Sequence, residues 1–140
     1  MTRHDILTLF EQRQAAFLRR DVGALADLYA EDGVVESLMA GTVRGRDAIG
    51  NVYRAWFAAF PDVVITSEDL IVDGLRAAHF MTHAGTDSGG FMGLPPTGKP
   101  FRIPIVHFFE FRDGRIVRER RIYDFTGLLV QIGVLKAKPA

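Results

Sequence analysis

KPFRIPIVHFFEFRDGRIVRERRIYDF, residues 99–125, is the stretch that decides the fold of this chain. Apolar and polar side chains alternate along it, and Asp113-Gly114 separates two runs, which is a strong signal for a β-hairpin. Because side chains alternate across a strand, His107, Phe109 and Phe111 are expected to share one face of the first run, and Val117, Glu119, Arg121 and Tyr123 are expected to share one face of the second. Each set combines polar groups with aromatic rings.

The register of the hairpin has two readings. With a two-residue turn, His107 lies opposite Arg120, whereas one extra residue in a β-bulge places it opposite Arg121. The outer face is expected to carry Phe108, Ile116 and Ile122 beside charged residues.

Three helices are expected before the strands. Apolar steps of three and four residues predict a helix over residues 4–19, with a stripe of Ile6, Leu7, Phe10, Gln14, Phe17 and Leu18. Asp21 is expected to cap a second helix that buries Leu25, Leu28 and Tyr29, ends at Gly33 and is followed by a strand to about Met39. Residues 41–62 read as a loop and a third helix, which buries Ile49, Tyr53, Trp56, Phe57 and Phe60 and stops at Pro61.

Most of the remaining chain is expected to form strands. Residues 63–74 and 75–86 are two strands, the Gly- and Pro-rich residues 88–100 form a loop, and an apolar segment closes the chain after residue 125. Helices followed by antiparallel strands indicate an α+β fold, in which one curved antiparallel sheet wraps over three N-terminal helices. Such a sheet encloses a pocket, the default place for a small-molecule site.

Composition narrows the functional class. The 140 residues suit a single domain over residues 1–140. The 17 basic side chains balance 17 acidic ones, so neither nucleic acid nor an anionic membrane is an expected partner. Without cysteine the chain offers no disulfide and no thiolate nucleophile, and no apolar run approaches the roughly 20 residues of a membrane span. We expect a cytoplasmic protein.

Three stretches carry a family resemblance. Residues 85–99 read GTDSGGFMGLPPTGK, residues 108–119 read FFEFRDGRIVRE, and residues 123–135 read YDFTGLLVQIGVL. They resemble the glycine-rich loop, the hairpin and the closing D-x-x-G-L-L-x-Q-x-G segment of the SnoaL-like polyketide cyclases, members of the NTF2-like superfamily of α+β cones. Residues 30–37 and 45–62 are similar to the superfamily's first strand and third helix. The resemblance implies a cone with a deep pocket, a homodimer through the outer sheet face, and cofactor-free acid–base chemistry on polyketide esters.

The catalytic positions of the family carry over only in part. On the alignment of the Asp-Gly turn and the G-L-L segment, the family's catalytic His falls on His107, whereas its catalytic Asp falls on Arg121, which reverses the charge. The His of the family's loop falls on Asp87. The general base of the related ketosteroid isomerases falls on Ser37, and the final Asp of the limonene-epoxide hydrolases also falls on Arg121. None of the three chemistries transfers intact.

The polar and aromatic candidate residues suggest a catalytic or a binding role for each position. His107 would act as general acid and base with a pKa near working pH, and Arg121 would stabilise an enolate or hold a carboxylate. Glu119 or Asp87 would orient the imidazole or pair with Arg121. The predicted substrate-binding residues are Ser37, Tyr53, Trp56, His79, His83, Phe109 and Tyr123. In the structural alternative, Arg121 and Glu119 form an internal ion pair, a backbone carbonyl binds His107, and Asp87 caps the glycine loop.

A metal site is not expected. His79 and His83 are four residues apart on a strand, about 13 Å, so a shared ion would need His79 to approach His107, or His83 to approach Asp87, across strands. No metal or other cofactor is predicted.

Three functions stay open. The leading one is cofactor-free isomerisation, cyclisation, or hydration and hydrolysis of a small, mostly apolar carbonyl compound. The second is a non-catalytic ligand-binding or scaffold protein of the same fold. The third is an interaction module that assembles through the outer sheet face and has a filled or very small cavity. The expected partners are a small hydrophobic ligand or substrate and a second copy of the chain.

Overall fold

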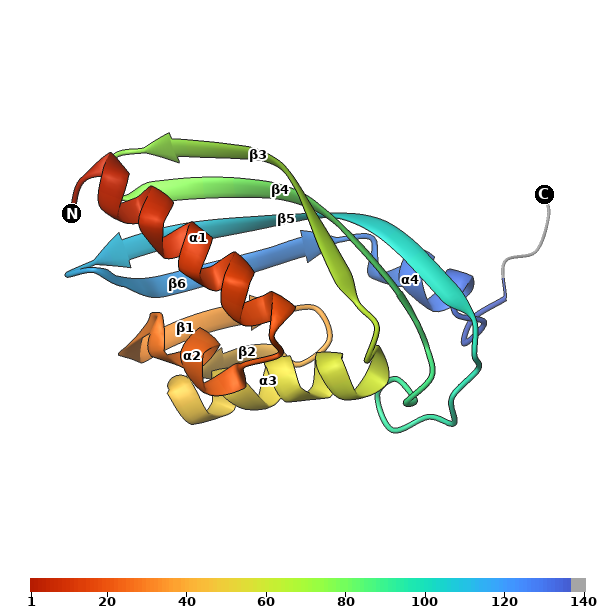
Figure 1. The fold of residues 1–140 in the computed structure, drawn as a ribbon. Coiled ribbons are helices and arrows are strands. Elements are labelled where there is room, and N and C mark those ends of the chain that lie inside the picture. The colour runs from red at the N-terminus through yellow and green to blue at the C-terminus, as the bar shows by residue number, and fades with distance from the viewer. Residues whose placement is uncertain (137–140) are drawn as a thin grey trace.

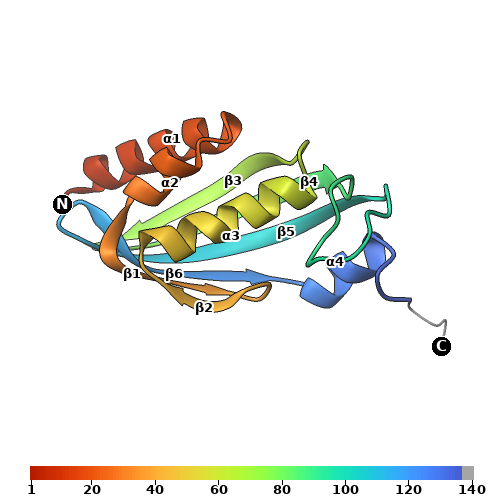
Figure 2. The ribbon, with the colours of Figure 1, turned by 90° about the horizontal axis from the view of Figure 1, so that it is seen from below.

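A curved sheet packed against three helices on one face forms the body of the protein (Figure 1), in a computed structural model that describes residues 1–136. The helices are α1 (Arg3–Leu18), α2 (Val22–Asp27), α3 (Arg46–Ala59) and α4 (Phe125–Gln131). The strands are β1 (Tyr29–Ser37), β2 (Gly41–Arg44), β3 (Val64–Asp73), β4 (Arg76–Thr86), β5 (Pro100–Arg112) and β6 (Arg115–Tyr123). Figure 2 shows α1, α2 and α3 on the same side of the sheet, with α4 beyond the end of β6.

The six strands lie in the order β2-β1-β6-β5-β4-β3. Neighbours are antiparallel except β1 and β6, which are parallel, so the expectation of a wholly antiparallel sheet is wrong at this pair. Short turns force β1 and β2, β3 and β4, and β5 and β6 to run antiparallel, whereas the long stretch of chain between β1 and β6 leaves their relative direction free.

The first two helices differ from the expectation at their ends. Asp21 caps α2 as predicted, since its Oδ1 accepts from the backbone N–H of Ala24 at 3.0 Å. However, α2 ends at Asp27, and both Tyr29 and Gly33 lie in β1. Gly33 falls where the register between β1 and β6 shifts, and a Cβ there would lie 2.9 Å from the carbonyl oxygen of Ala30. Glycine is therefore needed at Gly33 for close backbone approach within a strand.

The third helix is amphipathic as expected and ends before Pro61. Gly41–Arg44, predicted as loop, pairs with β1 as the short edge strand β2. Phe57 is only partly buried, while Val52 and Ala59 take buried positions on the same helix. The helix thereby presents a mostly apolar side to the sheet.

The β5–β6 hairpin contains the bulge that the second reading of the register required. Val117 is the extra residue, because Glu110 pairs with Arg118 whereas Phe111 pairs with Ile116. His107 consequently lies directly opposite Arg121. The same bulge turns Ile116 inward, where it is fully buried, so its predicted place on the outer face is wrong.

The core lies between the helices and the inner face of the sheet. On α1 the buried side holds Ile6, Leu9, Phe10, Arg13, Ala16 and Phe17. Leu18, which was expected in this stripe, is 73% exposed, and the charged Arg13 is buried instead.

Candidate active site

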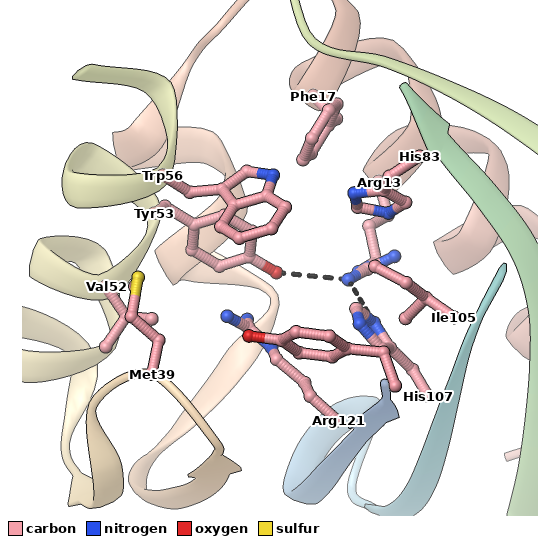
Figure 3. Close-up of a pocket in the computed structure, with 11 residues that line it drawn as sticks. Arg13, Phe17, Met39, Val52, Tyr53, Trp56, His83, Ile105, His107 and Arg121 are labelled. Atoms are coloured by element: carbon pink, nitrogen blue, oxygen red, sulfur yellow. Dashed lines mark hydrogen bonds between the residues drawn. The ribbon is translucent and has the colours of Figure 1, made fainter. Parts of the chain in front are cut away.

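A cavity lies where α1 and α3 face β4, β5 and β6 (Figure 3). Its volume is about 30 Å³, the room of one or two water molecules. The cavity is thus narrower than the deep pocket that the resemblance implies, because aromatic side chains fill much of the space between helices and sheet. It is lined by Arg13, Phe17, Met39, Val52, Tyr53, Trp56, His83, Ile105, His107, Arg121 and Tyr123.

Glu119, fully buried on β6, is the centre of a polar cluster at this cavity. Its Oε2 lies 2.9 Å from Nδ1 of His107, 3.0 Å from Nε of Arg121 and 3.4 Å from Nη2 of Arg13. Its Oε1 accepts a hydrogen bond from the hydroxyl of Tyr29. The bulge in the hairpin and the buried side of α1 together bring these groups to one carboxylate.

Two tyrosines complete the cluster. The hydroxyl oxygens of Tyr29 and Tyr53 are 2.7 Å apart, and Nη2 of Arg13 donates to the hydroxyl of Tyr53 at 3.3 Å. The guanidinium of Arg121 lies over the ring of Tyr53, 4.6 Å from its centroid. Tyr53 therefore holds both guanidinium groups in place.

The cluster holds more positive than negative charge. Burial alone would raise the pKa of Glu119, but Arg121, His107 and Arg13 hold it well below its usual range. Burial alone would lower the pKa of Arg121, but the charge of Glu119 outweighs burial and raises it. One ionised carboxylate thus faces two guanidinium ions, so the site carries a net charge of about +1 and favours an anion.

His107 is neutral at physiological pH. Burial lowers its pKa to about 4, against the opposing effect of Glu119, so the expectation of a pKa near working pH is wrong. Its Nδ1 is also 3.0 Å from Nη2 of Arg13. Because an ionised carboxylate is the stronger acceptor, the proton is best placed on Nδ1, where it binds Glu119. This tautomer leaves the lone pair on Nε2.

Three other predicted residues line the same cavity. Tyr123 stands at the end of β6, and burial raises its pKa to about 12, so it remains protonated. Trp56 and His83 face each other with ring centroids 5.9 Å apart. The indole nitrogen of Trp56 and both ring nitrogens of His83 are buried and have no hydrogen-bond partner within the described residues.

Besides Glu119, which lies behind the lining residues, four predicted residues do not line this cavity. The carboxylate of Asp87 accepts from the backbone of Gly90 and Thr97 and from the Thr97 hydroxyl, as the loop-capping alternative expects. Ser37 accepts from the N–H of Ala40 in the β1–β2 turn. The other two are buried elsewhere on the inner face: Nε2 of His79 is 2.7 Å from Oγ of Ser67, and the ring of Phe109 lies 5.2 Å below the guanidinium carbon of Arg13.

Arg13 is the site residue that the sequence analysis missed. It follows Phe10 by three residues and precedes Phe17 by four, so it falls on the apolar stripe of α1, yet only 3% of it is exposed. A charge in the middle of such a stripe is a signal, because an arginine is rarely buried unless it is paired.

Residues 1–136 contain no group of three His, Cys, Asp or Glu side chains placed to hold a metal ion. His79 does lie directly opposite His107 across β4 and β5, but without a third ligand. Within the same residues, no helix has the length and apolar character needed to cross a membrane.

A model of the SnoaL-like polyketide cyclases matches residues 8–132, nearly the whole chain. The chain belongs to this family. SnoaL-like membership agrees with the motifs at the glycine-rich loop, the hairpin and the closing helix, and the expected α+β cone is confirmed. No curated protein matches the chain.

Three solved structures of similar fold come from Streptomyces species. TsrD from Streptomyces laurentii superposes with a TM-score of 0.85 at 26% identity, covering 96% of this chain and 99% of that one. AclR from Streptomyces galilaeus, provisionally assigned as a hydroxylase, superposes with a TM-score of 0.84 at 26% identity, and the match covers 99% of this chain and 87% of AclR. IdmH from Streptomyces antibioticus, provisionally assigned as a polyketide cyclase, superposes with a TM-score of 0.76 at 33% identity, and the match covers 90% of this chain and 96% of IdmH. AclR and IdmH thus carry different assignments on a similar fold.

Proposed function

We propose that this SnoaL-like protein catalyses cofactor-free acid–base chemistry on a small, mostly apolar carbonyl compound, by way of an enolate. The observation that carries the proposal is the cluster of two buried guanidinium ions and one carboxylate around a neutral imidazole. A site with a net positive charge stabilises the anion that forms when a carbonyl compound loses an α-proton.

The first step is proton abstraction. Nε2 of His107 takes the α-proton, the C–H electron pair forms the C=C bond of the enolate, and the carbonyl oxygen becomes negative beside Arg121. The imidazolium is then stabilised through Nδ1–H by Glu119, at 2.9 Å. A base with a pKa of about 4 is weak in the empty site, but the enolate charge next to it raises its proton affinity.

The second step returns the proton. In an isomerisation, the imidazolium protonates another carbon of the enolate. In a cyclisation, the enolate carbon attacks a second carbonyl carbon, and the imidazolium protonates the alkoxide that results. Either route regenerates neutral His107. Arg13 contacts Glu119 and His107, and Tyr53 contacts Arg13 and Arg121, so we assign both residues to positioning these groups.

The size of the cavity limits the substrate. A volume of about 30 Å³ does not hold an aromatic ring, so binding must displace lining side chains. Met39, half-buried in the β1–β2 turn, is unbranched and flexible, which makes it the most adaptable of these side chains.

The test is deuterium exchange at an α-carbon. The protein is incubated in D₂O with acetone, 2-acetonaphthone or methyl acetoacetate, and the loss of the α-proton signal is followed by NMR. We expect exchange above the buffer rate, with a loss of about 100-fold or more in His107→Gln and Arg121→Gln. Arg120→Gln, an exposed neighbour on the other face of β6, is the matched control. Equal rates in all variants would contradict the proposal.

A non-catalytic ligand-binding protein is the second candidate, favoured by one observation. Arg121 is bound to Glu119 at 3.0 Å and its side chain is only 10% exposed, as an internal ion pair that closes the cavity would be. Exchange at the buffer rate with every probe, together with saturable binding of the same probes, would favour this candidate.

A further inference from the structure

Trp56 and His83, two uncharged side chains in the wall of the cavity, have buried nitrogen atoms without a hydrogen-bond partner among residues 1–136. These atoms are Nε1 of Trp56 and both ring nitrogens of His83. Nε of Arg13 also lacks a partner, but the guanidinium of Arg13 is already bound to Tyr53 and Glu119 through Nη2. Both side chains are more than nine-tenths buried, with 8% of Trp56 and 3% of His83 exposed, and both line the cavity. Buried polar groups are nearly always paired, so unpaired ones in a cavity wall mark the place where a ligand or a water molecule supplies the partner.

The surroundings of these atoms offer no partner. Aromatic rings pack around Trp56 on several sides, and the ring of Phe17 lies 5.6 Å from that of His83. The ring of His107 is 6.2 Å from that of His83, and its Nδ1 is already engaged with Glu119. In Figure 3 the Trp56 nitrogen and His83 lie beside Phe17, away from Arg121. They form a polar subsite apart from the Glu119 cluster.

The hydrogen-bonding capacity of the subsite defines its ligand. Burial, together with the positive charges of the nearby arginines, keeps the pKa of His83 well below its usual range, so the imidazole is neutral. A neutral imidazole has one donor and one acceptor, whereas the indole is a donor only. The rings of Trp56 and His83 are neighbours, with centroids 5.9 Å apart, and both line the cavity, so one small polar group of a ligand can lie within reach of both.

We propose that Trp56 and His83 form a hydroxyl-binding subsite, in which a substrate hydroxyl accepts from the indole N–H and donates to the imidazole lone pair. A ketone or ester oxygen has no proton to donate, so it could pair only with the N–H groups of Trp56 and His83, whereas a hydroxyl can pair with either ring nitrogen of His83. The subsite therefore selects a carbonyl compound that carries a phenolic or alcoholic hydroxyl away from its reacting carbon. This inference rests on the proposed function, which places the reacting carbonyl at Arg121 and His107.

The test compares ligands with and without the hydroxyl. Trp56 is the single tryptophan of the chain, so its indole N–H gives one signal in a ¹⁵N–¹H spectrum. One pair of probes is 6-hydroxy-2-acetonaphthone and 2-acetonaphthone. The second pair, phenol and toluene, is smaller, in case the cavity does not open far enough for a naphthalene ring. We expect the hydroxylated member to bind about tenfold more tightly and to move the indole proton downfield, as a new hydrogen bond does.

Two variants locate the effect. Trp56→Phe keeps an aromatic ring but removes the donor, and His83→Phe removes the acceptor, so each should reduce the preference to about twofold or less. Thermal unfolding identifies a variant that fails to fold, and the other variant then carries the test. Equal affinities within both pairs in the wild-type protein, or no binding of any probe, would overturn the proposal, since a water molecule then suffices for these nitrogens.

The two proposals fail in different ways. If the methyl ketone of 2-acetonaphthone exchanges its protons but the hydroxyl gives no preference, only the subsite is wrong. If the hydroxyl preference is present and depends on Trp56 and His83 but no probe undergoes exchange, the subsite stands and the acid–base function fails.

Discussion

Glu119 is the residue on which the site depends, because it is the carboxylate that pairs with both Arg13 and Arg121. Strand alternation in the sequence was enough to place Glu119 and Arg121 on one face of their strand, but His107 shares that face only because of the bulge in the hairpin. The depth of burial was not readable from that pattern, so the pKa of His107 was predicted near neutrality although burial lowers it to about 4. Arg13 was missed because a single helix pattern does not show what its charged member faces.

Replacement of Glu119 by Gln should strongly destabilise the protein. It leaves two buried guanidinium ions without their carboxylate, a loss of about 3–5 kcal/mol in the free energy of unfolding. Glu110→Gln is the matched control, because its carboxylate lies 3.7 Å from Arg118 at the partly exposed outer face and should matter by about 0.5 kcal/mol or less. Urea unfolding measures the free energy of unfolding of both variants. Equal losses would mean that the buried cluster around Glu119 contributes no more to stability than an ion pair at the outer face.

Among the elements, the β5–β6 hairpin and the edge of β1 decide the geometry of the site. The Asp113-Gly114 turn was evident in the sequence, whereas the bulge at Val117 depends on pairing with β5 and was left open. β2 and the parallel pairing of β1 with β6 were not predicted, because both depend on contacts between residues far apart in the chain. Local patterns therefore predicted the helices and hairpins better than the edge of the sheet.

Gly33→Ala should loosen the contact between β1 and β6. The new Cβ would lie 2.9 Å from the carbonyl oxygen of Ala30 and 3.3 Å from that of Ile116, so backbone must move, at a cost of about 1–3 kcal/mol. Gly23→Ala in α2 is the control, since its Cβ meets only Oδ1 of Asp21 at 3.7 Å, and alanine favours a helix. If chemical unfolding shows Gly33→Ala to be as stable as the wild type, the backbone around Gly33 does not approach the carbonyl oxygen of Ala30 as closely as described.

At the scale of the whole molecule, three buried neutral histidines make stability depend on pH. Burial lowers the pKa of His79 and His107 to about 4 and that of His83 well below its usual value. The unfolded chain takes up these protons as pH falls below about 6.5, whereas the folded chain does not, so the free energy of unfolding should fall between pH 6.5 and 4. The carboxyl of Glu119 stays ionised in both states through most of this window.

The loss should reach a few kcal/mol, since each unit of pKa shift corresponds to about 1.4 kcal/mol. Urea unfolding at pH 7.5, 5.5 and 4.5 measures it. His79→Gln should reduce the slope, and His4→Gln, which changes an exposed side chain, should not. A free energy of unfolding that is constant over this range would show that the three imidazoles are not buried as described.

Exposed apolar side chains on the outer face of the sheet indicate that the protein self-associates. Phe80, Val106 and Ile122 are paired in register across β4, β5 and β6, and Phe80 and Ile122 are 38% and 51% exposed. Because this apolar row matches the face through which SnoaL-like resemblance implies a dimer, we expect a homodimer that Ile122→Glu converts to monomer. Thr42→Glu, on the edge strand β2, is the control. Sedimentation velocity measures the oligomeric state of the wild-type protein and of both variants. A wild-type protein that stays monomeric at high concentration would refute this prediction.

The pH profile of α-proton exchange tests the central claim most directly, because it reports the ionisation of the base in the free protein. If neutral His107 in the cationic cluster is that base, kcat/KM for exchange in the wild-type protein should be constant from pH 7.5 to 5.5 and fall only as pH approaches about 4. A tenfold loss between pH 7.5 and 5.5, as an unperturbed imidazole with a pKa of about 6.5 would give, would contradict the account.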